Sequence, residues 1–256
     1  LYEFVSPSAP NLPSRREIEK LRRENGPNTR HLTVTHNGKK FFVKYNSLQV
    51  EEVRNQQFFF DQIAKRADSP IRIPEIYEVF ETKHDGYIVM EHIDIDHFAS
   101  DKQRSTAITE LVTIEPPPHA PLGPIGGGLI RHHFFDFIDA EAPVVYDSVE
   151  DLESHINRVL KAFKYLNQDL QQVHLTDERL VCYYSDLYKK NFPVDKNGQL
   201  WVVDFHHAGV LPISFMSFTL ALPIRDPIPF PYRNMIPIEH TDNFKAMRKA
   251  SWCFKT

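Results

Sequence analysis

The pattern of apolar and polar residues along the first 95 positions predicts a small antiparallel sheet with helices. Segments 31–36 (HLTVTH) and 39–45 (KKFFVKY) are predicted strands on either side of Asn37-Gly38, the dipeptide most typical of a two-residue β-hairpin turn. Segment 50–67 carries apolar residues at helical spacing, and segments 76–82 and 87–91 form a second predicted strand pair, with Asp85-Gly86 between them. Before the first hairpin, Ser14 is a good N-cap for a short charged helix that ends near Asn25-Gly26. The predicted order is helix, strand, strand, helix, strand, strand.

Beyond Ile93 the pattern becomes mainly helical. A helix is predicted over 100–112, a loop rich in proline and glycine over 115–128, and an amphipathic helix after Asp147-Ser148. The apolar positions of this last helix are Leu152, Ile156, Val159, Leu160, Phe163 and Leu166. Short β-like segments follow at 180–184, 191–194 and 200–204. The uncharged run 208–224 is too short to span a bilayer, contains two prolines and is expected to be buried core. We find no internal repeat.

Composition narrows the class of protein. The chain has 256 residues, of which 41% are hydrophobic, enough for a substantial core in one or two domains. A net charge of −4 disfavours a nucleic-acid or membrane-surface partner, since either needs a clustered basic excess. Two cysteines, Cys182 and Cys253, are too few for a disulfide framework, and no secretory leader is evident, so a cytoplasmic location is expected. The oligomeric state stays open.

Nine glycines constrain any nucleotide site. Their positions cannot form G-x-G-x-x-G or G-x-x-x-x-G-K-[ST], so neither the dinucleotide fingerprint nor the Walker-A loop is present. A nucleotide would have to bind in another way. The adjacent histidines 132–133 and 206–207 lack a placed Cys or carboxylate partner and are not expected to hold zinc.

The segment from Tyr184 to Phe205 carries the most specific chemical signal. Asp186 is followed by Asn191 five positions later and by Asp204 eighteen positions later. The first carboxylate can accept a proton from an attacking hydroxyl, while an amide oxygen and a second carboxylate are hard ligands suited to Mg²⁺ on nucleotide phosphates. A loop and a hairpin that return to the same end of the molecule would bring the three side chains together.

These motifs resemble the aminoglycoside phosphotransferase family of the protein-kinase-like superfamily, in a degenerate form common in fungi. The resemblance runs from about Leu12 to about Leu222, and its motifs are 42–44 (FVK), 52–55 (EVRN), 73–77 (IPEIY), 87–91 (YIVME), 126–131 (GGGLIR), 182–187 (CYYSDL), 191–192 (NF), 203–205 (VDF) and 211–217 (LPISFMS). It implies an α+β, bilobal fold with a β-rich N-terminal lobe over 1–91 and a larger, mainly helical C-terminal lobe over 92–256. The implied reaction is transfer of the γ-phosphate of ATP, with Mg²⁺, to a hydroxyl of a small-molecule acceptor.

The resemblance also implies roles for particular residues. Lys44 would bind the α- and β-phosphates and Glu52 would orient it, with Glu51 as the alternative partner. Asp186 would be the catalytic base. The hinge that meets adenine would be Met90, Glu91, His92 and Ile93, and the metal ligands would be Asn191 and Asp204. Region 119–146 would help form the acceptor site, with the Gly126–Gly128 loop on the substrate side, and Phe58, Phe59 and Phe60 would be core of the small lobe.

Several positions depart from the family pattern. Tyr184 stands where the family has His, Ser185 where it has Gly or Arg, and His206 where it has the Gly of Asp-Phe-Gly. Residues 25–29 (NGPNT) replace the glycine-rich loop. These departures keep a second hypothesis open, a pseudokinase that binds a nucleotide or a partner without turnover. A protein kinase is a third and less favoured hypothesis: a small-molecule acceptor is preferred to a protein because neither Ala-Pro-Glu nor a recognisable activation loop follows Asp204.

Overall fold

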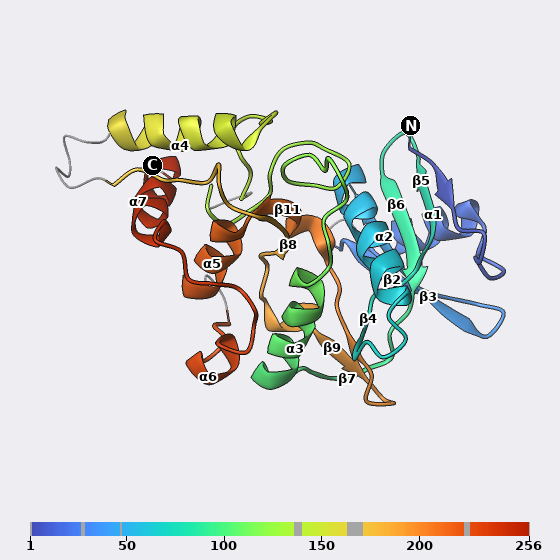
Figure 1. Ribbon diagram of the computed structural model, residues 1–256. Coiled ribbons are helices and arrows are strands. Elements are labelled where there is room, and N and C mark those ends of the chain that lie inside the picture. Colours follow the sequence, from blue (N-terminus) through green and yellow to red (C-terminus); the bar gives the residue numbers. More distant parts are fainter. Residues whose placement is uncertain are drawn as a thin grey trace.

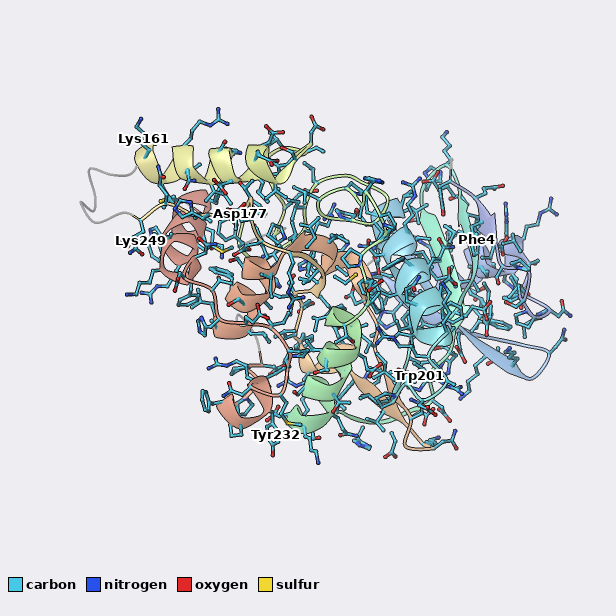
Figure 2. The ribbon with its side chains drawn as sticks, viewed as in Figure 1. Phe4, Lys161, Asp177, Trp201, Tyr232 and Lys249 are labelled. Atoms are coloured by element: carbon cyan, nitrogen blue, oxygen red, sulfur yellow. The ribbon has the colours of Figure 1, made fainter. Side chains whose placement is uncertain are left out.

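The computed structural model describes residues 2–26, 29–46, 48–135, 140–162, 171–222 and 226–255. A five-stranded sheet lies at one end of the molecule, most of the helices lie at the other, and helix α2 (Val50–Ala64) stands between them (Figure 1). Side chains fill the interior on both sides of α2, while Lys161 at the end of α4 (Val149–Ala162) points outward (Figure 2). The fold is α+β and bilobal, as the sequence predicted.

The five-stranded sheet is antiparallel throughout, in the order β1-β5-β6-β3-β2. Its strands are β1 (Phe4–Val5), β2 (His31–His36), β3 (Lys39–Asn46), β5 (Ile76–Glu81) and β6 (Gly86–Glu91). The predicted β2–β3 hairpin is confirmed: Asn37 and Gly38 both have positive φ, 49° and 76°, as a two-residue hairpin turn requires. The edge strand β1 was not predicted, because a two-residue strand carries no alternating pattern.

A helix covers each face of this sheet. Helix α1 (Arg15–Glu24) begins at Ser14, whose hydroxyl accepts a hydrogen bond from the Glu17 N–H, and buries Ile18 against one face. Helix α2 buries Val53 against the other face. It ends three residues earlier than predicted, at Ala64.

The phenylalanine run on α2, residues 58–60, packs against the helical part and not, as expected, against the five-stranded sheet. Phe59 is fully buried, but it belongs to the core of the helical part and stacks on Phe205, with ring centroids 5.2 Å apart. Phe58 and Phe60 are half-buried against the same core. The assignment of this run to the small-lobe core is therefore wrong for all three phenylalanines. One helix face contacts the sheet and the other contacts the helical part, so α2 joins the two.

A second, four-stranded sheet pairs segments that are far apart in the sequence. Its order is β4-β10-β9-β7, with β4 (Ile71–Arg72), β7 (Ile95–Phe98), β9 (Pro193–Asp195) and β10 (Leu200–Trp201). The predicted turn at 195–198 is confirmed by a hydrogen bond from the Gly198 N–H to the Asp195 carbonyl. Strand β10 is shorter than predicted, and a 3₁₀ turn, Lys189–Asn191, occupies the start of the segment predicted as the preceding strand.

The remaining chain forms the helical part. Helix α3 (Asp101–Val112) has a capping box between Ser100 and Gln103, and α4 follows Ser148 as predicted, although Phe163 and Leu166 lie outside the described residues. The uncharged run is buried at every position from 208 to 220, as predicted, and forms β11 (Ala208–Pro212), paired with β8 (Leu180–Tyr184), and then α5 (Ile213–Ala221). Helices α6 (Phe230–Arg233) and α7 (Phe244–Phe254) close the fold. No described helix has the length and apolar character needed to cross a membrane.

Candidate active site

A network of ion pairs around Lys44 lies between the sheet and the helical part. The Lys44 ammonium donates to both carboxylate oxygens of Glu52, at 2.6 and 2.8 Å, and lies 3.5 Å from Oδ1 of Asp204. Strand β3 supplies the lysine, and the first turn of α2 supplies Glu52, whose side chain is buried. The partner of Lys44 is therefore Glu52; the neighbouring Glu51 lies beside Gly128 instead.

The charges in this network stabilise one another. Burial opposes the charge of Lys44, but the carboxylates of Glu52 and Asp204 outweigh that effect and raise the pKa of the ammonium. Burial likewise opposes ionisation of Asp204, and the charge of Lys44 more than compensates, so the pKa of this carboxyl is lowered. Lys44 and Asp204 therefore face the site in their charged forms.

The turn that carries Asp204 is held from several sides. Asp204 has a left-handed backbone, with φ of 64° and ψ of 72°. The Tyr184 hydroxyl donates a 2.6 Å hydrogen bond to the carbonyl of the preceding residue, Val203. The buried amide of Asn55 donates to the carbonyls of Phe205 and Ala208, at 3.0 and 2.8 Å. The uncommon conformation of Asp204 is thus fixed by buried side chains on two other elements.

Asp186 and Asn191 lie on the loop that follows β8. The Asn191 side-chain amide donates to the Asp186 carbonyl at 3.2 Å, and the backbone carbonyl of Asn191 accepts from the Val203 N–H at 3.0 Å. The second bond joins this loop directly to the segment that carries Asp204. The structure thus brings Asp186, Asn191 and Asp204 to one region, from positions eighteen residues apart.

Two cavities meet at the ion-pair network. The first, of about 450 Å³, is polar. Its lining residues from the helical part are Asp186, Arg131, His206 and His207. The second, of about 390 Å³, has mainly apolar walls that include Phe42, Met90, Ile93 and Phe98. Asp204 and Lys44 line both cavities, Asp186 lines only the polar one, and Asn191 lines only the apolar one.

The predicted hinge comprises the last two residues of strand β6, Met90 and Glu91, and the two residues that follow them. Met90, Glu91 and Ile93 line the apolar cavity, whereas His92 is not among its lining residues. The Glu91 N–H donates to the Glu75 carbonyl at 2.9 Å, so this backbone donor is already used within the protein.

Sequence reasoning did not anticipate the part that Arg131 plays in the polar cavity. One of its guanidinium nitrogens donates to Nε2 of His206 at 2.7 Å, and the other lies 3.1 Å from the Gln49 side-chain oxygen and 3.0 Å from Glu141. Burial, followed by the charge of Arg131, lowers the pKa of His206 to about 3. Its ring is therefore neutral, and its Nε2 accepts a hydrogen bond from Arg131, because a guanidinium can only donate. In the sequence, Arg131 appears only as the last residue of the 126–131 motif, and no local pattern predicts its contact with His206.

The predicted acceptor region, 119–146, contributes less to the two cavities than expected. The Gly126 carbonyl accepts from Arg54 on α2 at 3.2 Å, and none of Gly126–Gly128 lines either cavity. Whether this loop lies on the substrate side stays a prediction. Region 119–146 contributes Arg131 to the polar cavity, and its residues 136–139 lie outside the described residues.

The donor groups suit a magnesium–nucleotide complex. Within the described residues no three His, Cys, Asp or Glu side chains gather to form an all-protein metal site. Mg²⁺ is usually held by one or two side-chain oxygens together with phosphates and water, which is what Asp204 and the amide oxygen of Asn191 could offer. The apolar cavity beside them has the size and character of a small-molecule site.

Comparison with known proteins finds similarity among solved structures only. No protein-family model matches the sequence, and no curated protein matches it. Among solved structures, a protein from Haemophilus somnus 129PT assigned as a fructosamine-3-kinase aligns with a TM-score of 0.50 at 12% identity, covering 88% of this chain and 76% of that one. The spectinomycin phosphotransferase APH(9)-Ia, solved with ADP and spectinomycin, also gives 0.50 at 12% identity, covering 88% of this chain and 78% of that one.

The chain has the protein-kinase-like fold. At this identity the likeness extends to the fold alone. The order of the site elements along the chain, a lysine strand, a glutamate helix and then the Asp186–Asp204 segment, supplies the chemistry on which a functional proposal must be based.

Proposed function

We propose that the protein is an ATP- and Mg²⁺-dependent phosphotransferase that transfers the γ-phosphate to a hydroxyl of a small molecule. The observation that carries the proposal is the position of Lys44, bonded to Glu52 and 3.5 Å from Asp204, where an apolar cavity joins a polar cavity that contains Asp186. This arrangement provides an apolar cavity for the nucleotide base, the ion-pair network for the phosphates and a polar cavity for the acceptor. A cytoplasmic location, where ATP and Mg²⁺ are abundant, suits this function.

The roles of the residues follow from their chemistry. Lys44 would neutralise phosphate oxygens, and Glu52 would hold its ammonium in place. Asn191 and Asp204 would hold Mg²⁺, which when bound neutralises charge on the phosphates. Asp186 would orient the acceptor hydroxyl and accept its proton. In phosphoryl transfer most of the rate gain comes from positioning and electrostatic stabilisation, so the fixed geometry of these side chains is the protein's main contribution.

The direct test is ATP-dependent phosphorylation measured with the Asp186→Asn variant. ADP release is followed over a panel of hydroxylated small molecules, with Asp68→Asn, an exposed aspartate on a turn, as the matched control. Asp186→Asn should lose at least about 100-fold in turnover while it still binds ATP, because general-base catalysis contributes roughly that much. Turnover that stays at the wild-type level in Asp186→Asn would disprove the mechanism.

A second candidate function is a nucleotide-binding module without turnover. It is favoured by His206, whose ring fills the position after Asp204-Phe205 and bonds to Arg131, and by the sequence 25–29, which has a single glycine where phosphates would be covered. ATP binding that stabilises the protein, combined with no ADP release for any acceptor, would favour this alternative.

A further inference from the structure

The two cavities share four side chains, those of Arg30, Lys44, Glu52 and Asp204. Three of the four form the ion-pair network to which the proposed function assigns the phosphates and Mg²⁺. Arg30 is the fourth, and the proposed function gives it no part. A nucleotide with its base in the apolar cavity and its terminal phosphate toward Asp186 would have to pass this junction, so its phosphates would pass Arg30.

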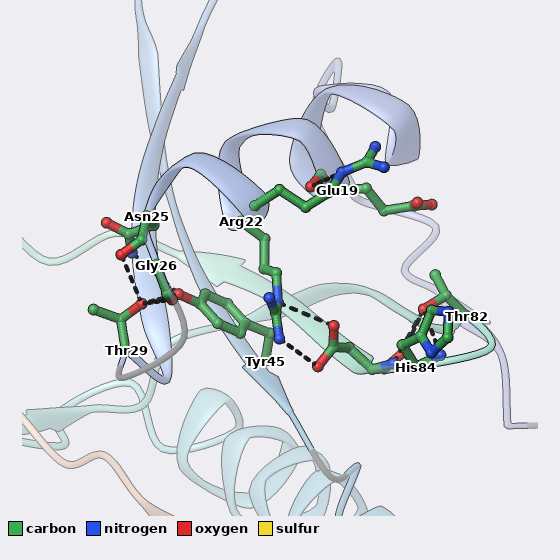
Figure 3. A network of polar contacts seen from close by, with 10 residues as sticks. Glu19, Arg22, Asn25, Gly26, Thr29, Tyr45, Thr82 and His84 are labelled. Carbon is green, nitrogen blue, oxygen red and sulfur yellow. Dashed lines mark hydrogen bonds and ion pairs between the residues drawn. The ribbon is translucent and has the colours of Figure 1, made fainter.

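The backbone at Arg30 is held in place by hydrogen bonds. The Tyr45 N–H donates to the Arg30 carbonyl at 2.9 Å. On either side, the Asn25 side-chain amide donates to the His31 carbonyl and to the Tyr45 hydroxyl, both at 3.1 Å. The hydroxyls of Thr29 and Tyr45 bond to each other (Figure 3). The entry to β2 is therefore attached to β3 immediately beside Lys44.

Tyr45 is itself anchored to helix α1. The Arg22 guanidinium lies over the Tyr45 ring, 5.6 Å from its centroid, and pairs with Asp85 at 3.0 Å (Figure 3). Thr29 and Arg30, at the end of the stretch where the family pattern has a glycine-rich loop, are thus bonded to strand β3.

The Arg30 side chain differs from its cationic neighbours in its partners. Lys44 pairs with Glu52 and Asp204, and Arg131 pairs with Glu141. Arg30 is exposed, and no carboxylate in the described part of the chain forms an ion pair with it. Its five N–H donors are thus open to an anion at the junction of the cavities.

We propose that Arg30 binds the phosphate chain of the nucleotide and replaces the backbone N–H donors of a glycine-rich loop. The inference rests on the proposed function, since it assumes a nucleotide at the junction. A guanidinium matches phosphate oxygens with two parallel hydrogen bonds, so one arginine on a fixed backbone supplies donors that several loop amides would otherwise provide.

Calorimetric titration with ATP and with adenosine, in the presence of Mg²⁺, tests this assignment. Arg30→Gln should weaken ATP binding about tenfold and leave adenosine binding within about twofold of wild type, because only the charge-assisted phosphate contact is removed. Arg30→Lys should recover part of the loss, since it restores the charge without the paired geometry. The matched control is Arg16→Gln, an exposed arginine on α1 that lines neither cavity, and it should bind like wild type.

Each other outcome overturns the assignment in a recognisable way. If wild type binds ATP and Arg30→Gln binds it equally well, Arg30 is not a phosphate ligand, although the proposed function stands. If Arg30→Gln weakens ATP and adenosine by the same factor, Arg30 supports the shape of the pocket instead. If wild type binds no nucleotide at all, the proposed function and the inference both fail. Thermal unfolding of each variant shows that the fold is intact.

Discussion

The Tyr184 hydroxyl donates a 2.6 Å hydrogen bond to the carbonyl of Val203, the residue directly before Asp204. The Tyr184 side chain is fully buried, and the rings of Phe192 and Phe205 pack edge-on against it at 5.8 and 5.5 Å. Tyr184 stands where the family pattern has histidine. In this chain it positions the turn that carries Asp204, because its buried side chain donates a hydrogen bond to the backbone there.

Tyr184→Phe should therefore weaken Mg²⁺-dependent nucleotide binding several-fold and destabilise the protein by about 1 kcal/mol, the usual net value of one buried hydrogen bond. The measurement is ATP affinity as a function of Mg²⁺ concentration. Tyr146→Phe, which removes a hydroxyl bonded to His155 away from the site, is the control for stability alone. An unchanged Mg²⁺ dependence in Tyr184→Phe would show that the turn keeps its conformation without this bond.

Lys44→Met should destabilise the protein as well as abolish turnover. Its removal leaves the buried Glu52 carboxylate without its bidentate partner, at a cost of about 2 kcal/mol after allowance for the partial exposure of Lys44. The double variant Lys44→Met/Glu52→Gln should regain much of this stability without regaining activity. Urea unfolding measures both effects, with Lys40→Met, an exposed lysine on the same strand, as control. A double variant no more stable than Lys44→Met would contradict the ion-pair explanation.

Asn55→Leu should be among the more destabilising single substitutions on α2. The side chain is fully buried and makes three hydrogen bonds, to the carbonyls of Phe205 and Ala208 and from the Ile125 N–H. Leucine leaves all three backbone groups unsatisfied, for a loss of about 3 kcal/mol. Gln62→Leu on the same helix is the control and should lie within about 0.5 kcal/mol of wild type. Equal unfolding midpoints for the two variants would refute this account.

Acid should remove a stabilising contribution of Glu153. Burial alone would raise the pKa of its carboxyl, but hydrogen bonds from the Leu175 N–H and from Thr176 outweigh burial and lower the pKa. A lowered pKa in the folded state means that the stabilisation is present above the unfolded-state pKa and is lost as pH falls through the folded-state value.

Glu153→Gln should accordingly reduce the free energy of unfolding at pH 7 by less than about 1 kcal/mol, since solvent screens this partly exposed group. The difference from wild type should shrink toward pH 3. Denaturant unfolding at several pH values measures it, and Glu115→Gln, in an exposed loop, should show no such trend. A difference that grows in acid would reverse the sign of the argument.

Local patterns predicted those parts of the fold that depend on local interactions. The β2–β3 hairpin depends on Asn37-Gly38, and helix α3 on its Ser100 cap, so both could be read from a few neighbouring residues. The run 208–220 has no periodicity because it is buried on all sides, so its division into β11 and α5 was not predictable. Strands β1 and β4 have two residues each and exist because distant strands pair with them.

The sequence by itself determined which chemical groups are present and their order: a lysine on a strand, acidic residues opening a helix, then Asp186, Asn191 and Asp204. Only the tertiary structure decided that Glu52 contacts Lys44, that Arg131 bonds to His206, and that Arg30 lies where the two cavities meet. The physical reason is that such contacts depend on strand register and on which helix face is buried. Those are properties of segments far apart in the chain, which no local pattern records.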